Sequence, residues 1–110
     1  MESARAIDKR QVTLYTQMMI TSFRHKGLAR FFATGSERDI QPRHARKLRL
    51  QLTALEHARG PHDMSGTGWG LHPLKGDRKG LFAVTVSGNW RLVFGFSGTD
   101  AIDVDYVDYH

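Results

Sequence analysis

Cysteine is absent from this sequence of 110 residues. Its absence excludes disulfides, thiolate metal sites and cysteine nucleophiles. The six histidines show no compensating metal-ligand spacing, since no H-E-x-x-H motif occurs and no close pair falls on a clearly helical segment. A serine nucleophile elbow is also missing. We therefore expect a protein that uses no metal and no cofactor.

Long apolar runs are missing as well. The first ten residues include Glu2, Arg5, Asp8, Lys9 and Arg10, which leaves no apolar stretch for a signal peptide. No run approaches the roughly 20 apolar residues of a membrane span. The sequence thus predicts a soluble cytoplasmic protein with no membrane contact.

Acidic residues are scarce in the first two-thirds of the chain. The net charge is +5, from 16 Lys and Arg against 11 Asp and Glu. Residues 19–80 hold 12 Lys and Arg against 5 acids, whereas residues 81–110 hold only Arg91 against four aspartates. Clustered cations favour a polyanionic partner, so we expect such a partner to meet the first two-thirds of the chain.

The pattern of apolar and polar residues changes at Met18-Met19. Residues 1–18 show no clear period, which favours a leader or an added extension outside the domain; a weak helix from about Asp8 to Met18 is the alternative. The length fits one domain, and we place it at residues 19–110.

Hydrophobic spacing predicts one short strand and two helices in the first half of the domain. Residues 20–23 fit an edge strand. Residues 27–33 have helical spacing and are closed by Gly35, and a second helix starts at Pro42 and ends at Gly60-Pro61. The two helices are expected to pack as an antiparallel pair. The apolar stripe of the second helix consists of Ala45, Leu48, Leu52 and Leu55.

Three strands are predicted after a loop at residues 60–70. They span residues 81–86, 90–96 and 101–106, with turns at 87–89 and 97–100. In the last strand Ile102, Val104 and Tyr106 are expected on the buried face and Asp103 and Asp105 on the other. The element order predicts an α+β fold with helices on one face of a small antiparallel sheet.

The densest group of reactive side chains is the glycine-flanked run 71–80. It holds His72, Lys75, Arg78 and Lys79. Glycines let a backbone approach a ligand, and cations provide charge for phosphate. A solvated basic loop ahead of a strand is the alternative interpretation.

Two further candidates lie in the last third of the chain. Asp108, Tyr109 and His110 are three consecutive groups that can transfer protons or donate hydrogen bonds, although chain ends are often frayed. Arg91 is the one cation among the strands, and a strand arginine is either simply exposed or held rigidly enough to stabilise developing charge.

Four motifs together resemble the HigB-type toxins of the RelE superfamily, also called plasmid maintenance system killer proteins. The motifs lie at residues 19–28 (Met-Ile-x-Ser-Phe-x-His-Lys-Gly-Leu), 71–77 (Leu-His-Pro-Leu-Lys-Gly-Asp), 88–91 (Gly-Asn-Trp-Arg) and 105–110 (Asp-Tyr-x-Asp-Tyr-His). The resemblance covers essentially all of residues 19–110. It implies a RelE-like fold, with two N-terminal helices packed on a small curved antiparallel sheet.

The resemblance also implies a function. It implies the toxin of a type II toxin–antitoxin system, a ribosome-dependent endoribonuclease that cleaves messenger RNA. Its implied partners are a HigA-type helix-turn-helix antitoxin, through which alone the operator DNA would be bound, and the ribosome with its message. The positions that match the family's active-site region are His72, Lys75, Arg91, Asp108, Tyr109 and His110.

Metal-free RNA cleavage needs a proton acceptor at the 2′-hydroxyl, positive charge at the phosphate and a proton donor for the leaving 5′-oxygen. His72, Asp108 or Tyr109 can take the proton roles, and Lys75 and Arg91 suit the phosphate. We expect a second set of cations to bind RNA or the ribosome: Arg43, Arg46, Lys47, Arg49, Arg78 and Lys79.

Two other functions remain open at this point. RelE-like folds also host ParE-like toxins, which poison DNA gyrase without cleaving RNA, and fold alone does not choose between them. A non-catalytic RNA-binding module would use the same basic helix.

Overall fold

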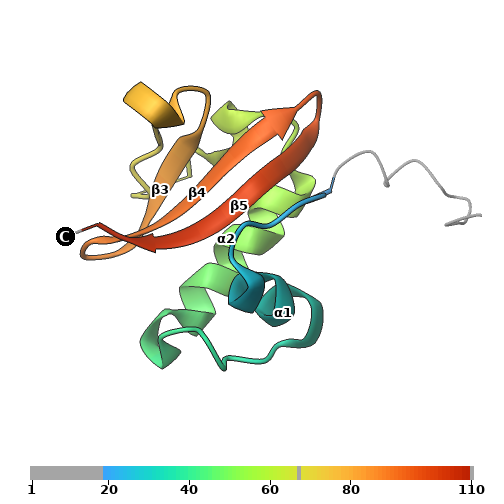
Figure 1. The fold of residues 1–110 in the computed structure, drawn as a ribbon, viewed down its shortest axis with the longest axis vertical. Coiled ribbons are helices and arrows are strands. Elements are labelled where there is room, and N and C mark those ends of the chain that lie inside the picture. Colours follow the sequence, from blue (N-terminus) through green and yellow to red (C-terminus); the bar gives the residue numbers. More distant parts are fainter. Residues whose placement is uncertain (1–18, 67, 110) are drawn as a thin grey trace, which may run out of the picture.

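A computed structural model describes residues 19–66 and 68–109 of the chain, so the predicted leader at residues 1–18 lies outside the described residues. Its helices and strands form two layers (Figure 1). The α-helices are α1 (Lys26–Thr34) and α2 (Ala45–His57). Short 3-10 helices are η2 (Pro42–His44), η3 (Pro61–Met64) and η4 (Gly76–Arg78), and the strands are β2 (His72–Pro73), β3 (Phe82–Ser87), β4 (Trp90–Ser97) and β5 (Asp100–Asp108).

The strands form one antiparallel sheet in the order β2-β3-β4-β5. In Figure 1, α2 passes behind β4 and β5, so one face of the sheet is covered by helix. The predicted α+β class with a small antiparallel sheet is therefore confirmed. The described helices include none that is long and apolar enough to cross a membrane.

The core lies between the helices and this covered face. The predicted stripe of α2 is buried throughout, from Ala45 to Leu55. The strands contribute alternate residues because successive side chains of a strand point to opposite faces. The buried cluster contains Leu28, Phe31, Leu48, Leu52 and Leu55 from the helices and Val84, Val86, Leu92, Phe94, Ala101, Val104 and Tyr106 from the sheet.

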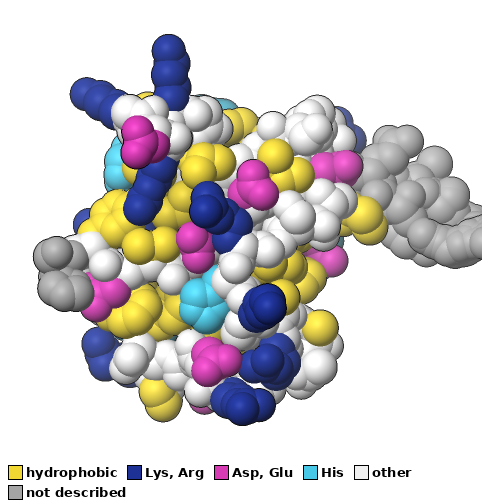
Figure 2. All heavy atoms as spheres, in the orientation of Figure 1, with side chains coloured by type: hydrophobic (Ala, Val, Ile, Leu, Met, Phe, Trp, Pro, Cys, Tyr) yellow, Lys and Arg dark blue, Asp and Glu magenta, His cyan; other side chains and the backbone are white. Residues whose placement is uncertain are grey.

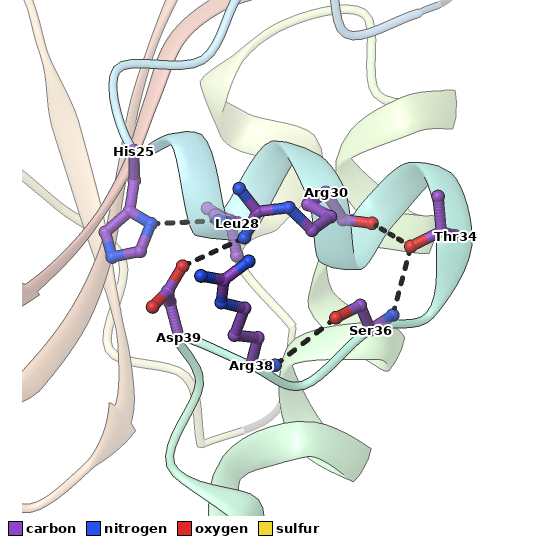
Figure 3. Close-up of polar contacts among 7 residues, drawn as sticks. All are labelled: His25, Leu28, Arg30, Thr34, Ser36, Arg38 and Asp39. Atoms are coloured by element: carbon purple, nitrogen blue, oxygen red, sulfur yellow. Dashed lines mark hydrogen bonds and ion pairs between the residues drawn. The ribbon is translucent and has the colours of Figure 1, made fainter.

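Local hydrogen bonds fix both ends of α1 (Figure 3). At its start, the Nδ1 of His25 accepts a hydrogen bond from the amide of Leu28 at 2.8 Å, which satisfies one of the free N–H groups of the first turn. At its end, Gly35 takes a left-handed conformation and donates to the carbonyl of Phe31, as predicted from its position. Arg30 and Asp39 form an ion pair at 2.9 Å that joins α1 to the following loop.

One prediction for the last strand is wrong. Ile102 does not share a face with Val104 and Tyr106, because β5 carries one extra residue opposite Phe94. Asp103, with a φ of 53°, lies in this bulge and shifts the alternation by one position. The core-facing residues of β5 are therefore Ala101, Val104 and Tyr106.

Three smaller expectations also need correction. Residues 20–23 meet β5 only through isolated parallel bridges, Ile20 with Ala101 and Phe23 with Val104. Pro42 starts a 3-10 turn ahead of α2, and α2 ends at His57 rather than at residue 60. The predicted loop 60–70 contains η3, whose last residue, Met64, is fully buried in the core.

The close approach of Gly27 in α1 to Asp39 gives a prediction for stability. A Cβ added at the buried Gly27 would lie 2.4 Å from the Cβ of Asp39. Helix propensity alone favours Gly27→Ala by up to about 1 kcal/mol, but overpacking costs roughly 1–3 kcal/mol. We expect Gly27→Ala to lower the free energy of unfolding in urea titrations by about 1–2 kcal/mol.

The same substitution in an Asp39→Gly background serves as the control, since that background lacks the opposing Cβ. There, Gly27→Ala should be neutral or stabilising. Equal losses in the two backgrounds would show that the contact with Asp39 is not the cause.

Candidate functional site

The face of the sheet turned away from α1 and α2, here called the outer face, carries most of the predicted site. Directly paired residues of antiparallel strands share a face. One row across the sheet consists of His72, Ala83, Val93 and Asp105, and the next consists of Thr85, Arg91 and Val107. Ala83 and Val93 are buried yet lie outside the core cluster, so the outer face has an apolar floor. Figure 2 shows this face, with hydrophobic side chains between Lys and Arg side chains.

His72 lies on edge strand β2 and is exposed. Its Nδ1 is 2.9 Å from the carbonyl oxygen of Gly70. A carbonyl can only accept a hydrogen bond, so Nδ1 carries the proton and Nε2 of the neutral ring has a free lone pair. This arrangement suits a group that accepts a proton at Nε2.

The basic loop follows β2 and is tied to the sheet at its base. The amide of Leu74 donates a hydrogen bond to the carbonyl of Leu81 at 2.9 Å. The side chain of Leu81 packs closely on Gly95: a Cβ added at Gly95 would lie 2.8 Å from Cδ2 of Leu81. Between these anchors Lys75 precedes η4, and Gly76 and Gly80 take positive φ values that favour glycine. Lys75, Arg78 and Lys79 are exposed on this loop.

Arg91 is the second residue of β4 and lies between Thr85 of β3 and Val107 of β5. Its Nη1 donates to the carbonyl of Gly88 at 2.6 Å and to that of Trp90 at 3.1 Å. The guanidinium group is therefore held against the β3–β4 turn, at the end of the outer face where β5 leaves the sheet.

The residues after Tyr106 lie against the same turn. Asp108 pairs with Trp90, and the amide of Tyr109 donates to the carbonyl of Asn89 at 2.8 Å. The hydroxyl of Tyr109 accepts a hydrogen bond from Nη1 of Arg78, and the Arg78 guanidinium carbon lies 5.1 Å from the centroid of the Tyr109 ring. His110 lies outside the described residues.

The structure brings part of the predicted set together. Arg91 and Tyr109 lie at one end of the outer face, and strand spacing places the Cα of His72 roughly 12 Å from that of Arg91, two strands away. Asp108 follows the core-facing Tyr106 by two positions, so it belongs to the helix-covered side of the sheet. It lines a hollow of about 430 Å³ there with Arg43, Ser87, Gly88, Asn89 and Trp90.

Within residues 88–91, only Arg91 was predicted from the sequence to be a site residue. Asn89 and Trp90 line this hollow beside Asp108. The sequence feature that could have pointed to them is the turn between β3 and β4, because the strand that pairs with β4 must end beside that turn. The described residues form no group of three or more His, Asp or Glu side chains that could hold a metal ion.

The predicted cationic surface lies on η2 and α2. Arg43, Arg46, Lys47 and Arg49 surround a hollow of about 620 Å³ with Leu50 and Thr53, and Leu50 is 61% exposed. The first turn of α2 contains no acidic residue, although a helix N-terminus favours negative charge. Arg46 and Lys47 have no carboxylate partner within the described ranges. This uncompensated charge suits an anionic partner.

A buried aromatic cluster connects this surface to β5. His44 is 1% exposed, and its Nδ1 lies 2.6 Å from the hydroxyl of Tyr106. The ring of Trp90 stacks on the ring of Tyr106, with 4.5 Å between the ring centroids. Burial, and then the positive charge of Arg43, lower the pKa of His44. Burial raises the pKa of Tyr106. The start of the helical layer is thereby fixed to the strand that leads into the site.

The lowered pKa of His44 gives a prediction for stability. The unfolded chain takes up a proton at this histidine near pH 6.5, whereas the folded chain does so only at lower pH. The stabilising contribution is therefore present above pH 6.5 and is lost as the pH falls through the folded-state pKa. We expect the free energy of unfolding to decrease between pH 7 and pH 5, measured by urea titration.

His44→Gln is the matched variant, because it keeps a buried polar side chain that does not titrate. Its free energy of unfolding should be lower at pH 7 but should change less with pH. A variant with the parental slope would assign the pH dependence to other histidines.

Two comparisons with known proteins bear on this geometry. A protein-family model described as RelE-like toxin of type II toxin-antitoxin system HigB matches residues 21–110. The protein named Endoribonuclease HigB from Proteus vulgaris is 38% identical over 92 residues, which cover 84% of this chain and all of that protein.

Proposed function

This chain belongs to the family of RelE-like HigB toxins of type II toxin–antitoxin systems, and we propose that it is an endoribonuclease that cleaves messenger RNA on the ribosome and so blocks translation. The relative from Proteus vulgaris carries the name of an endoribonuclease. One observation supports the activity most directly: the outer face combines a histidine whose Nε2 is free with an arginine fixed to backbone carbonyls.

The proposed reaction is attack by the RNA's own 2′-hydroxyl. A base removes the proton of that hydroxyl, the 2′-oxygen bonds to the adjacent phosphorus, and the bond from phosphorus to the 5′-oxygen breaks. A donor supplies the proton that the leaving 5′-oxygen needs. The products are a 2′,3′-cyclic phosphate and a 5′-hydroxyl, and this balance requires no co-reactant.

We assign roles from the contacts of each side chain. His72 accepts the 2′ proton at Nε2, since its Nδ1 is engaged with Gly70. Arg91 and Lys75 stabilise the charge that develops on the phosphate oxygens. Tyr109 donates a proton to the leaving oxygen. Asp108 and His110, its neighbours in the sequence, are the remaining members of the proposed catalytic set.

The proposed partners follow from the shape of the site and from the family. The reactive groups of the outer face are spread over roughly 12 Å, which fits an enzyme whose substrate is positioned by the ribosome. We propose neutralisation by a HigA-type helix-turn-helix antitoxin, with operator DNA bound only through that antitoxin. Residues 1–18 are proposed to lie outside the toxin domain, since the family match begins at residue 21.

We expect Arg91→Ala to slow cleavage of ribosome-bound message by about 10²–10³-fold, the typical loss when one preorganised donor is deleted. Deletion of residues 108–110 should abolish cleavage, because it removes both Tyr109 and its neighbours. Both variants should still bind the antitoxin, because that binding depends on the surface of the toxin and not on the groups that carry out the reaction. The measurement is single-turnover cleavage on reconstituted ribosomes.

Lys26→Ala provides the control, since it removes an exposed cation from α1, far along the chain from the proposed site. Parental cleavage rates in both site variants would contradict the assignment. Inhibition of gyrase supercoiling by the parent protein would favour the ParE-like alternative, and ribosome binding without cleavage would favour a passive RNA-binding module.

The cationic surface of α2 gives a separate prediction for ribosome docking. Arg46→Glu combined with Lys47→Glu should weaken ribosome binding on the order of tenfold or more and reduce its dependence on salt, because contacts to phosphate release counterions. Thermal stability should be retained, since Arg46 is exposed and Lys47 lies on the solvent side of the helix.

The control for this pair is Lys26→Glu with Arg38→Glu, which makes the same change in net charge at exposed positions on and after α1. If the control pair weakens binding equally, net charge alone is responsible. If neither pair changes affinity or salt slope, α2 is only a solvated face.

A further inference from the structure

We propose that Arg78 is a positioning residue whose side chain holds Tyr109 in place on the outer face; this inference rests on the proposed nuclease function. From the sequence, Arg78 and Lys79 are both expected to contact RNA or the ribosome. The structure instead directs the guanidinium group of Arg78 to a side chain of the chain itself.

Two contacts of different kinds join the pair. Nη1 of Arg78 donates to the Tyr109 hydroxyl, and the guanidinium carbon lies 5.1 Å from the ring centroid. A planar guanidinium group can stack on a ring and donate a directed hydrogen bond, which an ammonium group does less well. The pair thus restrains both the ring and its hydroxyl.

Tyr109 needs such a restraint because the sheet does not supply one. The pairing of β4 with β5 ends at Trp90 and Asp108, and Tyr109 follows with a single backbone hydrogen bond to Asn89. That bond fixes the course of the main chain but leaves the side chain free to rotate. Arg78 is the described residue whose side chain bonds to the hydroxyl of Tyr109.

Arg78 is well placed to act as the fixed end of the contact. Its loop is closed by the hydrogen bond between Leu74 and Leu81, and Leu81 packs against Gly95. This base lies where β3 begins, whereas Tyr109 meets the turn that follows the end of β3. The pair therefore spans about five residues of strand, roughly 15 Å of the outer face.

The direction of the hydrogen bond matters for chemistry. Arginine only donates, so the Tyr109 oxygen accepts and its own hydrogen remains available. That hydrogen is the one that the leaving 5′-oxygen needs in the proposed reaction. Arg78 thereby orients the donor, without itself touching the phosphate.

The test compares Arg78→Ala with Lys26→Ala, which removes an exposed cation from α1 and touches neither proposed set of site residues. Single-turnover cleavage is measured against ribosome concentration and salt, and the aromatic ¹³C heteronuclear NOE of the Tyr109 ring is measured in the free protein. We expect Arg78→Ala to lower the rate at saturating ribosomes by up to about a hundredfold. Its half-saturating concentration and salt slope should stay parental, and the Tyr109 NOE should fall. Lys26→Ala should leave the saturating rate and the NOE unchanged.

Arg78→Lys separates positioning from charge. It keeps the positive charge, so a phosphate contact would survive it in large part, whereas the proposed role predicts a loss close to that of Arg78→Ala. A higher half-saturating concentration and a flatter salt slope in Arg78→Ala, with the saturating rate retained, would overturn the proposal in favour of a phosphate contact. A parental NOE in Arg78→Ala would also overturn it. If the parent protein cleaves no RNA, the proposed function fails, and the NOE still decides whether Arg78 holds Tyr109.

Discussion

The pairing of β4 with β5 is the constraint on which the rest of the structure depends. One face of this ribbon supplies Leu92, Phe94, Val104 and Tyr106 to the core, and that burial fixes its register. The register then determines what the other face presents. Arg91 lies beside Val107 on the outer face, and Tyr109 leaves the ribbon next to the β3–β4 turn. The hydrophobic effect that holds the sheet on its helices thus also positions the reactive groups, although none of those groups belongs to the core.

The positively charged side chains lie in two separate regions of the surface. The cations of α2 face outward from the helical layer, and the cations of the β2–β3 loop border the outer face of the sheet. An RNA substrate is negative along its whole length, so two basic regions on different sides can meet two different stretches of nucleic acid. This division agrees with a small enzyme that docks through one surface and reacts through another.

The sequence predicted the fold well wherever the period of apolar residues was unbroken. The stripe of α2 and the alternation of β4 follow directly from the spacing of their side chains, and Gly35 marks the end of α1 through its conformation. The sequence could not reveal the bulge at Asp103, because an extra residue in a strand is a property of the pairing and leaves no local pattern. Met64 shows the same limit, since its complete burial comes from packing in the shared core and leaves no periodic pattern in the short η3. For the site, the residue types were predictable, but their contacts were not. The bond from Arg78 to Tyr109 joins positions 31 apart in the chain, and the separation of Asp108 from Arg91 follows from strand alternation at the end of β5.

The central claim is that the outer face promotes attack by the RNA's own 2′-hydroxyl, and the ends of the cleaved message test it most directly. A ribosome-bound message is cleaved by the full chain, and mass spectrometry identifies the new termini. The account predicts a 2′,3′-cyclic phosphate, or the 3′-phosphate to which it opens, on the upstream fragment and a 5′-hydroxyl on the downstream one. It also predicts that a message with a single 2′-deoxynucleotide before the scissile phosphate stays intact. A 3′-hydroxyl with a 5′-phosphate, or cleavage of the deoxy-substituted message at the parental rate, would contradict it, since both outcomes require water rather than the 2′-oxygen as the nucleophile.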